Sequence, residues 1–328
     1  MTSNEERRQA AKRKLEERLA AQRAQARKRR RIILGSTGFV VVVAIAVGAY
    51  FAIDAYQDHV YNSEHARCDY VDAKNNFGSL PPVADNLTGE QATFAAQYKD
   101  RLATGEKKAR TTSKPDSRPK NSGKVDLTMQ TSQGAIPMTL NRSGAACNVN
   151  AFVHLADEKY FNDSDCHRLV TATEQSKLAV LQCGDPTATG LGNPGWSSPD
   201  EFPTDLKTVP GSEQQMPGSS LAIYPRGTIA IANSYSPGYG SAPTGQNTGS
   251  AQFFIVAKDS QLPPNYSVVG TVDDAGMAVI DKVYAAGVTP TPEPSGQDQA
   301  TGKLNAFATS PTDGAPKLPV HIETAKVA

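Results

Sequence analysis

The sequence predicts a mainly β fold in residues 125–328, in the form of a closed antiparallel barrel of eight strands capped by two helices. Two observations predict it. Apolar residues alternate with a period of two in the segments that open this region. Further short apolar segments, bounded by turn-forming residues, recur between two amphipathic helical patterns. We expect a single transmembrane helix and a flexible tether to precede this domain.

The first two strands are expected to form a hairpin. The turn is the polar segment 131–134, and apolar residues on both sides of it point toward one face. These residues are Val125, Leu127, Met129, Ile136, Met138 and Leu140. The alternation on both sides of a short turn therefore marks the start of the β domain.

Two amphipathic helices are expected to follow. In the first, Asn148 is placed to cap a helix whose apolar positions recur on one face, namely Val149, Phe152, Val153, Ala156 and Tyr160. The second extends from Asp274 to Ala286, and Gly287 is placed to end it.

Six further strands complete the predicted barrel. Five lie between the helices, near residues 166–170, 178–183, 227–233, 250–256 and 267–272, and the last is 318–322. Together with the hairpin they make about eight strands, the number that closes a small barrel.

The N-terminal segment differs sharply from this domain. Residues 1–31 hold twelve lysines and arginines against four glutamates, a local charge of +8 within a chain of net charge +1. Residues 32–53 carry no charge and are long enough to cross a bilayer. The positive-inside rule then predicts a cytoplasmic segment 1–31, a transmembrane signal anchor 32–53 and an extracytoplasmic remainder. A cleaved signal peptide is the alternative.

Residues 54–124 are expected to be an extracytoplasmic tether, partly disordered, because their proline-rich and polar stretches bury little apolar area. A polar helix within 89–110 is expected to act as a spacer. The basic N-terminus is explained by topology and by anionic lipid, so no nucleic-acid partner is expected.

The four cysteines allow three disulfide connectivities. In a tight hairpin Arg168 and Gln182 share a face, so Cys166 shares it too and Cys183 points oppositely. This parity weakly favours Cys147 with Cys166 and Cys68 with Cys183. A zinc site at His167 is disfavoured because no C-x-x-C pair exists, and no metal is expected.

Three ordered blocks of residues resemble the cyclophilin family of peptidyl-prolyl isomerases. They are Cys166-His167-Arg168-Leu169 with Gln182-Cys183-Gly184-Asp185, then 227–233, then Gly245-x-Asn247-Thr248-Gly249-Ser250-x-Gln252-Phe253-Phe254-Ile255. The resemblance covers roughly residues 125–328. It implies a cyclophilin-like barrel with the two helices at its ends, and isomerisation of X-Pro bonds without a cofactor.

By the same resemblance, Arg168 donates to the twisted prolyl amide, while Gln182 and Gln252 hold its orientation or the substrate carbonyls. The proline pocket would be formed by Phe254, Leu262, Val180 and Ala179, with Tyr266 where the family has a histidine. The backbone at Ala232 and Asn233 would pair with the peptide.

The expected function is therefore isomerisation of proline-containing polypeptides that have been exported, by a monomeric, membrane-anchored enzyme. The alternative is a cyclophilin-like domain that binds peptides with little catalysis, since Ala179 replaces a pocket phenylalanine and the loop 171–177 is enlarged. Gln261 replaces a tryptophan that contributes to cyclosporin binding in the family. A hydrolase triad is poorly supported because the domain has three histidines and no G-x-S-x-G motif.

Overall fold

The computed structural model describes residues 4–75, 77, 80–212, 220–238 and 242–328, without the side chains of Glu5 and of residues 33–44. The chain divides into two units, Met1–Ser63 and Glu64–Ala328. The strands that the structure describes all belong to the second unit.

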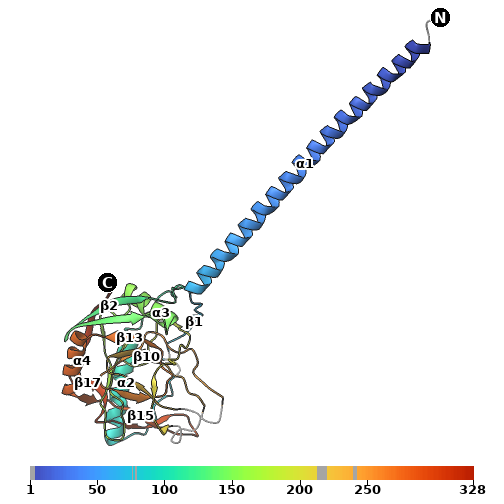
Figure 1. Cartoon of the computed structure of the whole chain (residues 1–328). Coiled ribbons are helices and arrows are strands. Elements are labelled where there is room, and N and C mark those ends of the chain that lie inside the picture. The colour runs from blue at the N-terminus through green and yellow to red at the C-terminus, as the bar shows by residue number, and fades with distance from the viewer. Residues whose placement is uncertain (1–3, 76, 78–79, 213–219, 239–241) are drawn as a thin grey trace. The chain divides into compact units, whose positions relative to one another are not determined.

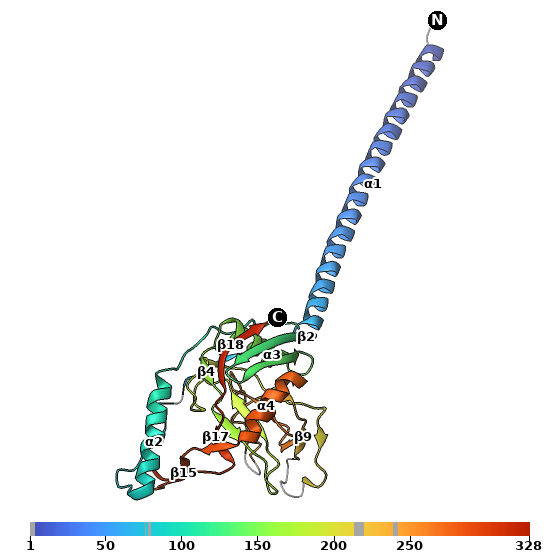
Figure 2. The same cartoon turned by 90° about the vertical axis from the view of Figure 1, so that its left-hand side faces the viewer.

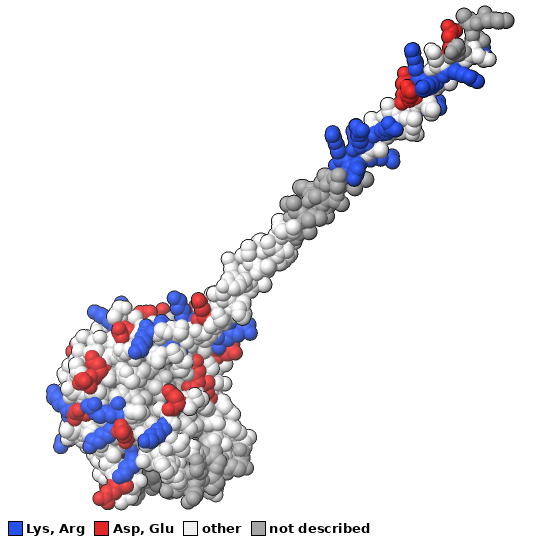
Figure 3. Space-filling model, in the orientation of Figure 1, with Lys and Arg blue, Asp and Glu red and all other residues white. Residues whose placement is uncertain are grey.

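The first unit is formed by a long helix, α1 (Asn4–Glu64). Its basic side chains gather on the N-terminal half (Figure 3). In the described part of the chain, no helix combines the length and the apolar character needed to cross a membrane.

This finding overturns the predicted transmembrane anchor at 32–53, and with it the predicted single-pass location. Apart from Ile32, the apolar side chains that the structure describes there lie between Ile45 and Ile53 and are followed by Asp54. A spanning helix needs roughly 20 apolar residues. The side chains of 33–44, which belong to the same prediction, lie outside the described residues.

The second unit is built on a sheet of eleven strands in the order β14-β17-β5-β6-β11-β10-β13-β3-β2-β18-β4 (Figure 1). Their bounds, in the same order, are Val288–Pro290, Asp313–Pro316, Arg168–Val170, Val180–Cys183, Phe253–Val256, Thr228–Ile231, Val268–Val272, Gly134–Asn141, Lys124–Thr131, His321–Val327 and Ser164–Asp165. The neighbouring pairs are antiparallel.

The predicted closed barrel of eight strands is wrong, because this sheet is open. The strand expected near 166–170 is present as β5, which pairs with β6, while β4 lies just before that segment and pairs with β18. The other edge of β5 is taken by β17. Among the described residues, the sheet therefore ends at β4 and β14 without joining.

Smaller elements complete the unit. β8 (Lys207–Thr208), β9 (Ala222–Tyr224) and β12 (Ser260–Leu262) form a three-stranded sheet, and β15 (Glu293–Gln297) pairs with β16 (Leu304–Ala308). β1 (Val71–Asp72) pairs with β7 (Trp196–Ser197).

The two faces of the central strands pack in different apolar clusters. Leu169, Leu181 and Phe253 belong to the large core, where the ring of Phe253 lies 4.9 Å from that of Phe152. On the opposite face Val180 and Phe254 belong to a second, smaller apolar cluster. This alternation places the Arg168 face of the sheet away from the main core.

Two helices pack on the sheet as expected, although one of them begins differently. α4 (Asp274–Ala286) has the predicted bounds, and Gly287 occupies its C-cap. α3 (Ala146–Asp157) has Ala145 at its N-cap, so the prediction that Asn148 caps it is wrong. The carboxylate of Glu201 instead accepts the N–H groups of Cys147 and Asn148, at 3.0 and 2.8 Å. Glu201, which is distant in the sequence, thus takes the place of a capping residue at the start of the helix.

The predicted flexible tether is also wrong for the described part of residues 64–123, in which several segments pack on the β domain. Helix α2 (Gly89–Glu106) buries Ala95 and Tyr98 against Leu304 and Phe307 of β16. The rings of Tyr98 and Phe307 lie 5.4 Å apart. Figures 1 and 2 both show α2 beside β15. The helix looked too polar for a core because only one narrow face of it is apolar.

Two disulfides join Cys68 to Cys147 and Cys166 to Cys183. The predicted pairing is wrong because Cys166 precedes the first residue of β5, so strand parity does not govern its direction. The first bridge spans 79 residues and ties the N-terminal segment to α3. In the chain-entropy model, closing such a loop stabilises the fold by about 4 kcal/mol.

The docking of α2 gives a test of stability. Tyr98→Ala should lower the free energy of unfolding by about 3 kcal/mol, because it removes a buried aromatic ring. Gln97→Ala, at an exposed position of the same helix, should change it by less than about 0.5 kcal/mol. Urea unfolding of the full chain measures both. Equal effects of the two variants would contradict the packing of α2.

Candidate active site

Three of the predicted residues lie in a row across three adjacent strands. Arg168 on β5 is the register partner of Gln182 on β6, and Gln182 is the partner of Phe254 on β11. Side chains of directly paired residues point to the same face of a sheet. Strand pairing alone therefore brings an arginine, an amide and an aromatic ring together.

A chain of hydrogen bonds fixes the two glutamines and the arginine. Arg168 Nη1 donates to Gln182 Oε1 at 3.2 Å, and Gln182 Nε2 donates to Gln252 Oε1 at 3.0 Å. Gln252 Nε2 then donates to the carbonyl oxygens of Gly190 and Gly192, at 2.9 and 3.2 Å. Because an amide has a donor end and an acceptor end, those carbonyls set the orientation of both glutamines.

The loop that supplies these carbonyls is organised by Asp185, whose side chain is fully buried. The Asp185 carboxylate accepts the N–H groups of Thr187, Gly190 and Gly192, at 2.8, 2.7 and 3.2 Å. A Cβ at Gly192 would collide with this carboxylate, which explains a glycine there. Asp185 therefore positions Gln252 indirectly.

Asp313 on β17 is the partner of Arg168 that sequence reasoning missed. Its carboxylate accepts Nε–H at 2.8 Å and Nη2–H at 2.7 Å in a bidentate pair. These bonds and the charge of Asp313 raise the pKa of the Arg168 guanidinium, against the opposing effect of burial. No motif marks this aspartate, because it reaches the site only through the pairing of β17 with β5.

A small cavity of about 150 Å³ lies beside Arg168 on the same face, and we call it the apolar cavity after the aromatic and aliphatic side chains in its wall. Its walls bring together Phe254, Leu262, Val180 and Tyr266 with Ala232, Asn233 and Leu178. The ring of Tyr266 meets that of Phe254 edge-on at 5.4 Å. A cavity of this size and character fits a proline ring.

Ala179 does not line this cavity. It is fully buried in the main core, and its N–H donates to Ser260 Oγ at 3.0 Å. Its neighbour Leu178 faces the cavity instead. Side chains alternate from Gln182 back through Val180, so Leu178 faces the cavity and Ala179 faces the core.

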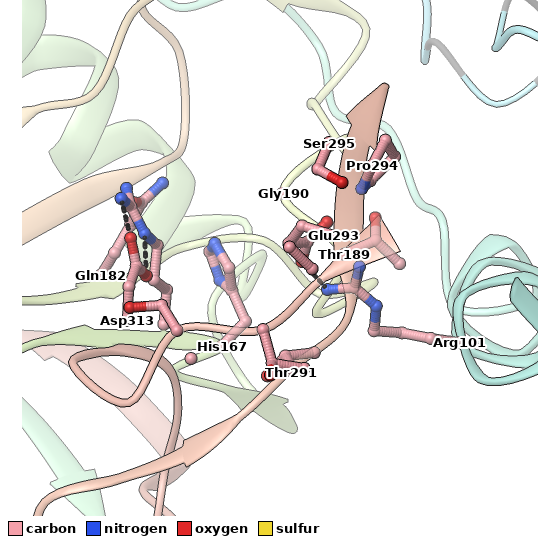
Figure 4. Close-up of a pocket in the computed structure, with 15 residues that line it drawn as sticks. Arg101, His167, Gln182, Thr189, Gly190, Thr291, Glu293, Pro294, Ser295 and Asp313 are labelled. Carbon is pink, nitrogen blue, oxygen red and sulfur yellow. Dashed lines mark hydrogen bonds and ion pairs between the residues drawn. The ribbon is translucent and has the colours of Figure 1, made fainter. Parts of the chain in front are cut away.

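Two larger cavities flank the apolar one. A cavity of about 470 Å³ on the Gln252 side is lined by Ala232, Asn233 and the Gly190–Gly192 backbone. Another, of about 480 Å³, lies on the Asp313 side (Figure 4). Gln182 lines all three. An extended polypeptide can therefore occupy positions on either side of the apolar cavity.

The backbone near Ala232 is itself held in place. Its N–H donates to the Gln252 carbonyl at 2.9 Å, and the Asn233 side chain donates to the carbonyl of Asn265 at 2.6 Å. These bonds fix the rim of the apolar cavity opposite Arg168.

Comparison with known proteins agrees with this geometry. Residues 125–302 match the family model described as cyclophilin type peptidyl-prolyl cis-trans isomerase/CLD. The fold and the arginine–glutamine–phenylalanine row thus define a cyclophilin-type domain, and the chain belongs to that family.

Curated relatives share this part of the chain. A probable peptidyl-prolyl cis-trans isomerase B of Mycobacterium tuberculosis is 42% identical over 170 residues, which cover 52% of this chain and 50% of the relative. The corresponding protein of Mycobacterium leprae is 41% identical, with 52% of each covered. The chain thus spans about half the length of these relatives.

A solved structure also matches. It is the Cryptosporidium parvum cyclophilin type peptidyl-prolyl cis-trans isomerase, 19% identical with a TM-score of 0.40, which covers 63% of this chain and 98% of that one.

His167, next to Arg168 in the chain, is held neutral. Burial lowers the pKa of the imidazole to about 4 from the usual 6.5, helped by Arg168 and Arg101 and opposed by Asp185. Below pH 6.5 the unfolded chain therefore binds a proton that the folded chain does not, until the pH approaches 4.

This difference predicts a pH dependence of stability. The free energy of unfolding contributed by His167 is fully present above pH 6.5 and should fall by up to about 1.4 kcal/mol per pH unit between pH 6 and 4. His167→Gln lacks this proton uptake, so its curve should be flatter than the wild-type curve. Urea unfolding midpoints of both proteins, measured between pH 4 and pH 6.5, test this pH dependence. Parallel curves for the wild type and the variant would contradict a neutral His167 in the folded chain.

Proposed function

We propose that the chain catalyses cis-trans isomerisation of X-Pro bonds in polypeptides, with residues 125–328 as the catalytic domain. The observation that carries the proposal is a rigidly held guanidinium beside an apolar cavity of proline size. The activity named for the curated relatives agrees with it.

The chemistry requires few groups. Rotation about the amide faces a barrier of roughly 18 to 20 kcal/mol because the nitrogen lone pair is delocalised into the carbonyl. In the twisted transition state this lone pair returns to nitrogen. A hydrogen-bond donor that contacts the nitrogen lone pair only in this transition state lowers the barrier.

Arg168 supplies this donor. Of its five N–H groups, two are taken by Asp313 and one by Gln182, which leaves one on each Nη for the substrate. Phe254, Leu262, Val180 and Tyr266 hold the proline ring, and Gln252 with the backbone at Ala232 and Asn233 holds the peptide on either side. Because the guanidinium is already oriented, little reorganisation is needed at the moment of rotation.

Arg168→Ala tests this role. We expect kcat/KM for a proline-containing tetrapeptide to fall by about 10² to 10³, the loss typical of an electrostatic donor. Arg226→Ala is the matched control, since Arg226 forms a similar 2.7 Å ion pair with Asp281 and lines none of the three cavities. A protease-coupled assay on the full chain measures both. Isomerase activity that is the same in the two variants would refute the proposal.

Asp313→Asn tests the positioning of Arg168. An amide keeps the size of the side chain but loses one acceptor and the charge, so the guanidinium gains freedom. We expect kcat to fall by about tenfold to a hundredfold with little change in KM. Asp281→Asn should leave both constants unchanged. If Asp313→Asn changes KM alone, Asp313 serves binding rather than orientation.

The alternative of peptide binding without catalysis is favoured by one observation, the engagement of three Arg168 N–H groups by protein acceptors. NMR exchange spectroscopy on a proline peptide separates the two. A binder shifts the peptide signals, whereas an isomerase also produces cis–trans exchange cross-peaks.

A further inference from the structure

The cavity on the Asp313 side of Arg168, called here the β17 cavity, has walls formed by segments that are far apart in the sequence. They come from α2 through Arg101, from β15 through Glu293 and Ser295, and from β17 through Asp313 (Figure 4). Arg101 precedes the region matched by the family model, and Asp313 follows it. Segments that this chain adds outside the matched region therefore help to build the cavity.

The β17 cavity adjoins the apolar one. Arg168 and Gln182 line both. A polypeptide whose proline occupies the apolar cavity therefore places a neighbouring residue within reach of the β17 cavity.

The charges in the wall of the β17 cavity are balanced. Arg101 pairs with Glu293 at 2.7 Å, and Arg168 pairs with Asp313 at 2.7 Å. His167 is neutral near pH 7, since burial lowers its pKa. A charged occupant would lose hydration without gaining an unpaired counter-charge among these described residues, which is unfavourable.

The rest of the wall mixes hydroxyl-bearing side chains with apolar ones. Hydroxyl groups of Thr189, Thr291, Ser295, Thr309 and Ser310 line it. His167 points into the cavity, between Gln182 and Asp313 on one side and Glu293 on the other (Figure 4). A hydroxyl group can both donate and accept a hydrogen bond, so the hydroxyl-bearing side chains can meet either end of a neutral polar group.

We propose that the β17 cavity is a substrate subsite for a neutral polar side chain, that of Asn, Gln, Ser or Thr, adjacent to the proline. The inference rests on the proposed isomerase function and extends it to substrate selection. The cavity volume of about 480 Å³ leaves room for such a side chain and the backbone that carries it.

Peptides that differ beside the proline test the subsite. Gln, Leu, Lys or Glu is placed in turn before and after the proline, and kcat/KM is measured by NMR exchange with the full chain. At one of the two positions we expect the Gln peptide to be turned over about fivefold faster than the other three.

Two variants narrow the cavity from its exposed rim without touching Arg168, namely Ser295→Trp and Thr309→Trp. Each should abolish the preference for Gln and leave turnover of the Leu peptide unchanged. Gln299→Trp, at an exposed position that does not line the cavity, is the matched control and should keep the preference.

The possible failures are distinct. Turnover of all peptides without a preference, or an equal loss for every peptide in both Trp variants, contradicts the subsite and leaves the isomerase function intact. Absence of turnover of every peptide by the wild-type chain contradicts the proposed function and the subsite with it.

Discussion

The pairing of β5 with its two neighbours is the constraint on which the site depends. β6 brings Gln182 to one side of Arg168, and β17 brings Asp313 to the other. A free arginine side chain has several rotatable bonds and would sample many directions. Here acceptors on both neighbouring strands satisfy three of its N–H groups and fix the plane of the guanidinium. The remaining N–H groups thereby acquire a defined direction.

The polar chain through Gln182 and Gln252 extends this constraint into the neighbouring loop. An amide can be turned around at little cost unless its partners distinguish oxygen from nitrogen. The carbonyls of Gly190 and Gly192 make that distinction, and the buried Asp185 holds those carbonyls in place. A Cβ at Gly184 would clash with the backbone of Ala251, so glycine there lets this loop lie against the residue just before Gln252. The buried Asp185 carboxylate thus helps to fix the direction of the Arg168 side chain, through the hydrogen bonds of Gln252 and Gln182.

Segments far from the matched region complete the surroundings of Arg168. α2 packs on β16 through Tyr98 and Phe307, and the Cys68–Cys147 bridge attaches the same N-terminal segment to α3. These contacts carry Arg101 to the edge of the site, where it pairs with Glu293. Helix α2, which the sequence predicted to be a spacer, therefore contributes to the wall of the cavity beside Arg168.

The sequence by itself determined the features that depend on neighbours in the chain. The hairpin of β2 and β3 follows from alternation around a short turn, and α4 ends at Gly287 because a glycine is favoured there. The blocks around Arg168, Gln182 and Phe254 supply most of the residues that the structure brings together in the candidate site. Only the tertiary structure decided the contacts between residues that are far apart in the sequence, because such contacts leave no pattern among neighbouring residues. Glu201 rather than Asn148 caps α3, β17 keeps the sheet open, the cysteines pair otherwise than strand parity suggested, and Asp313 holds Arg168.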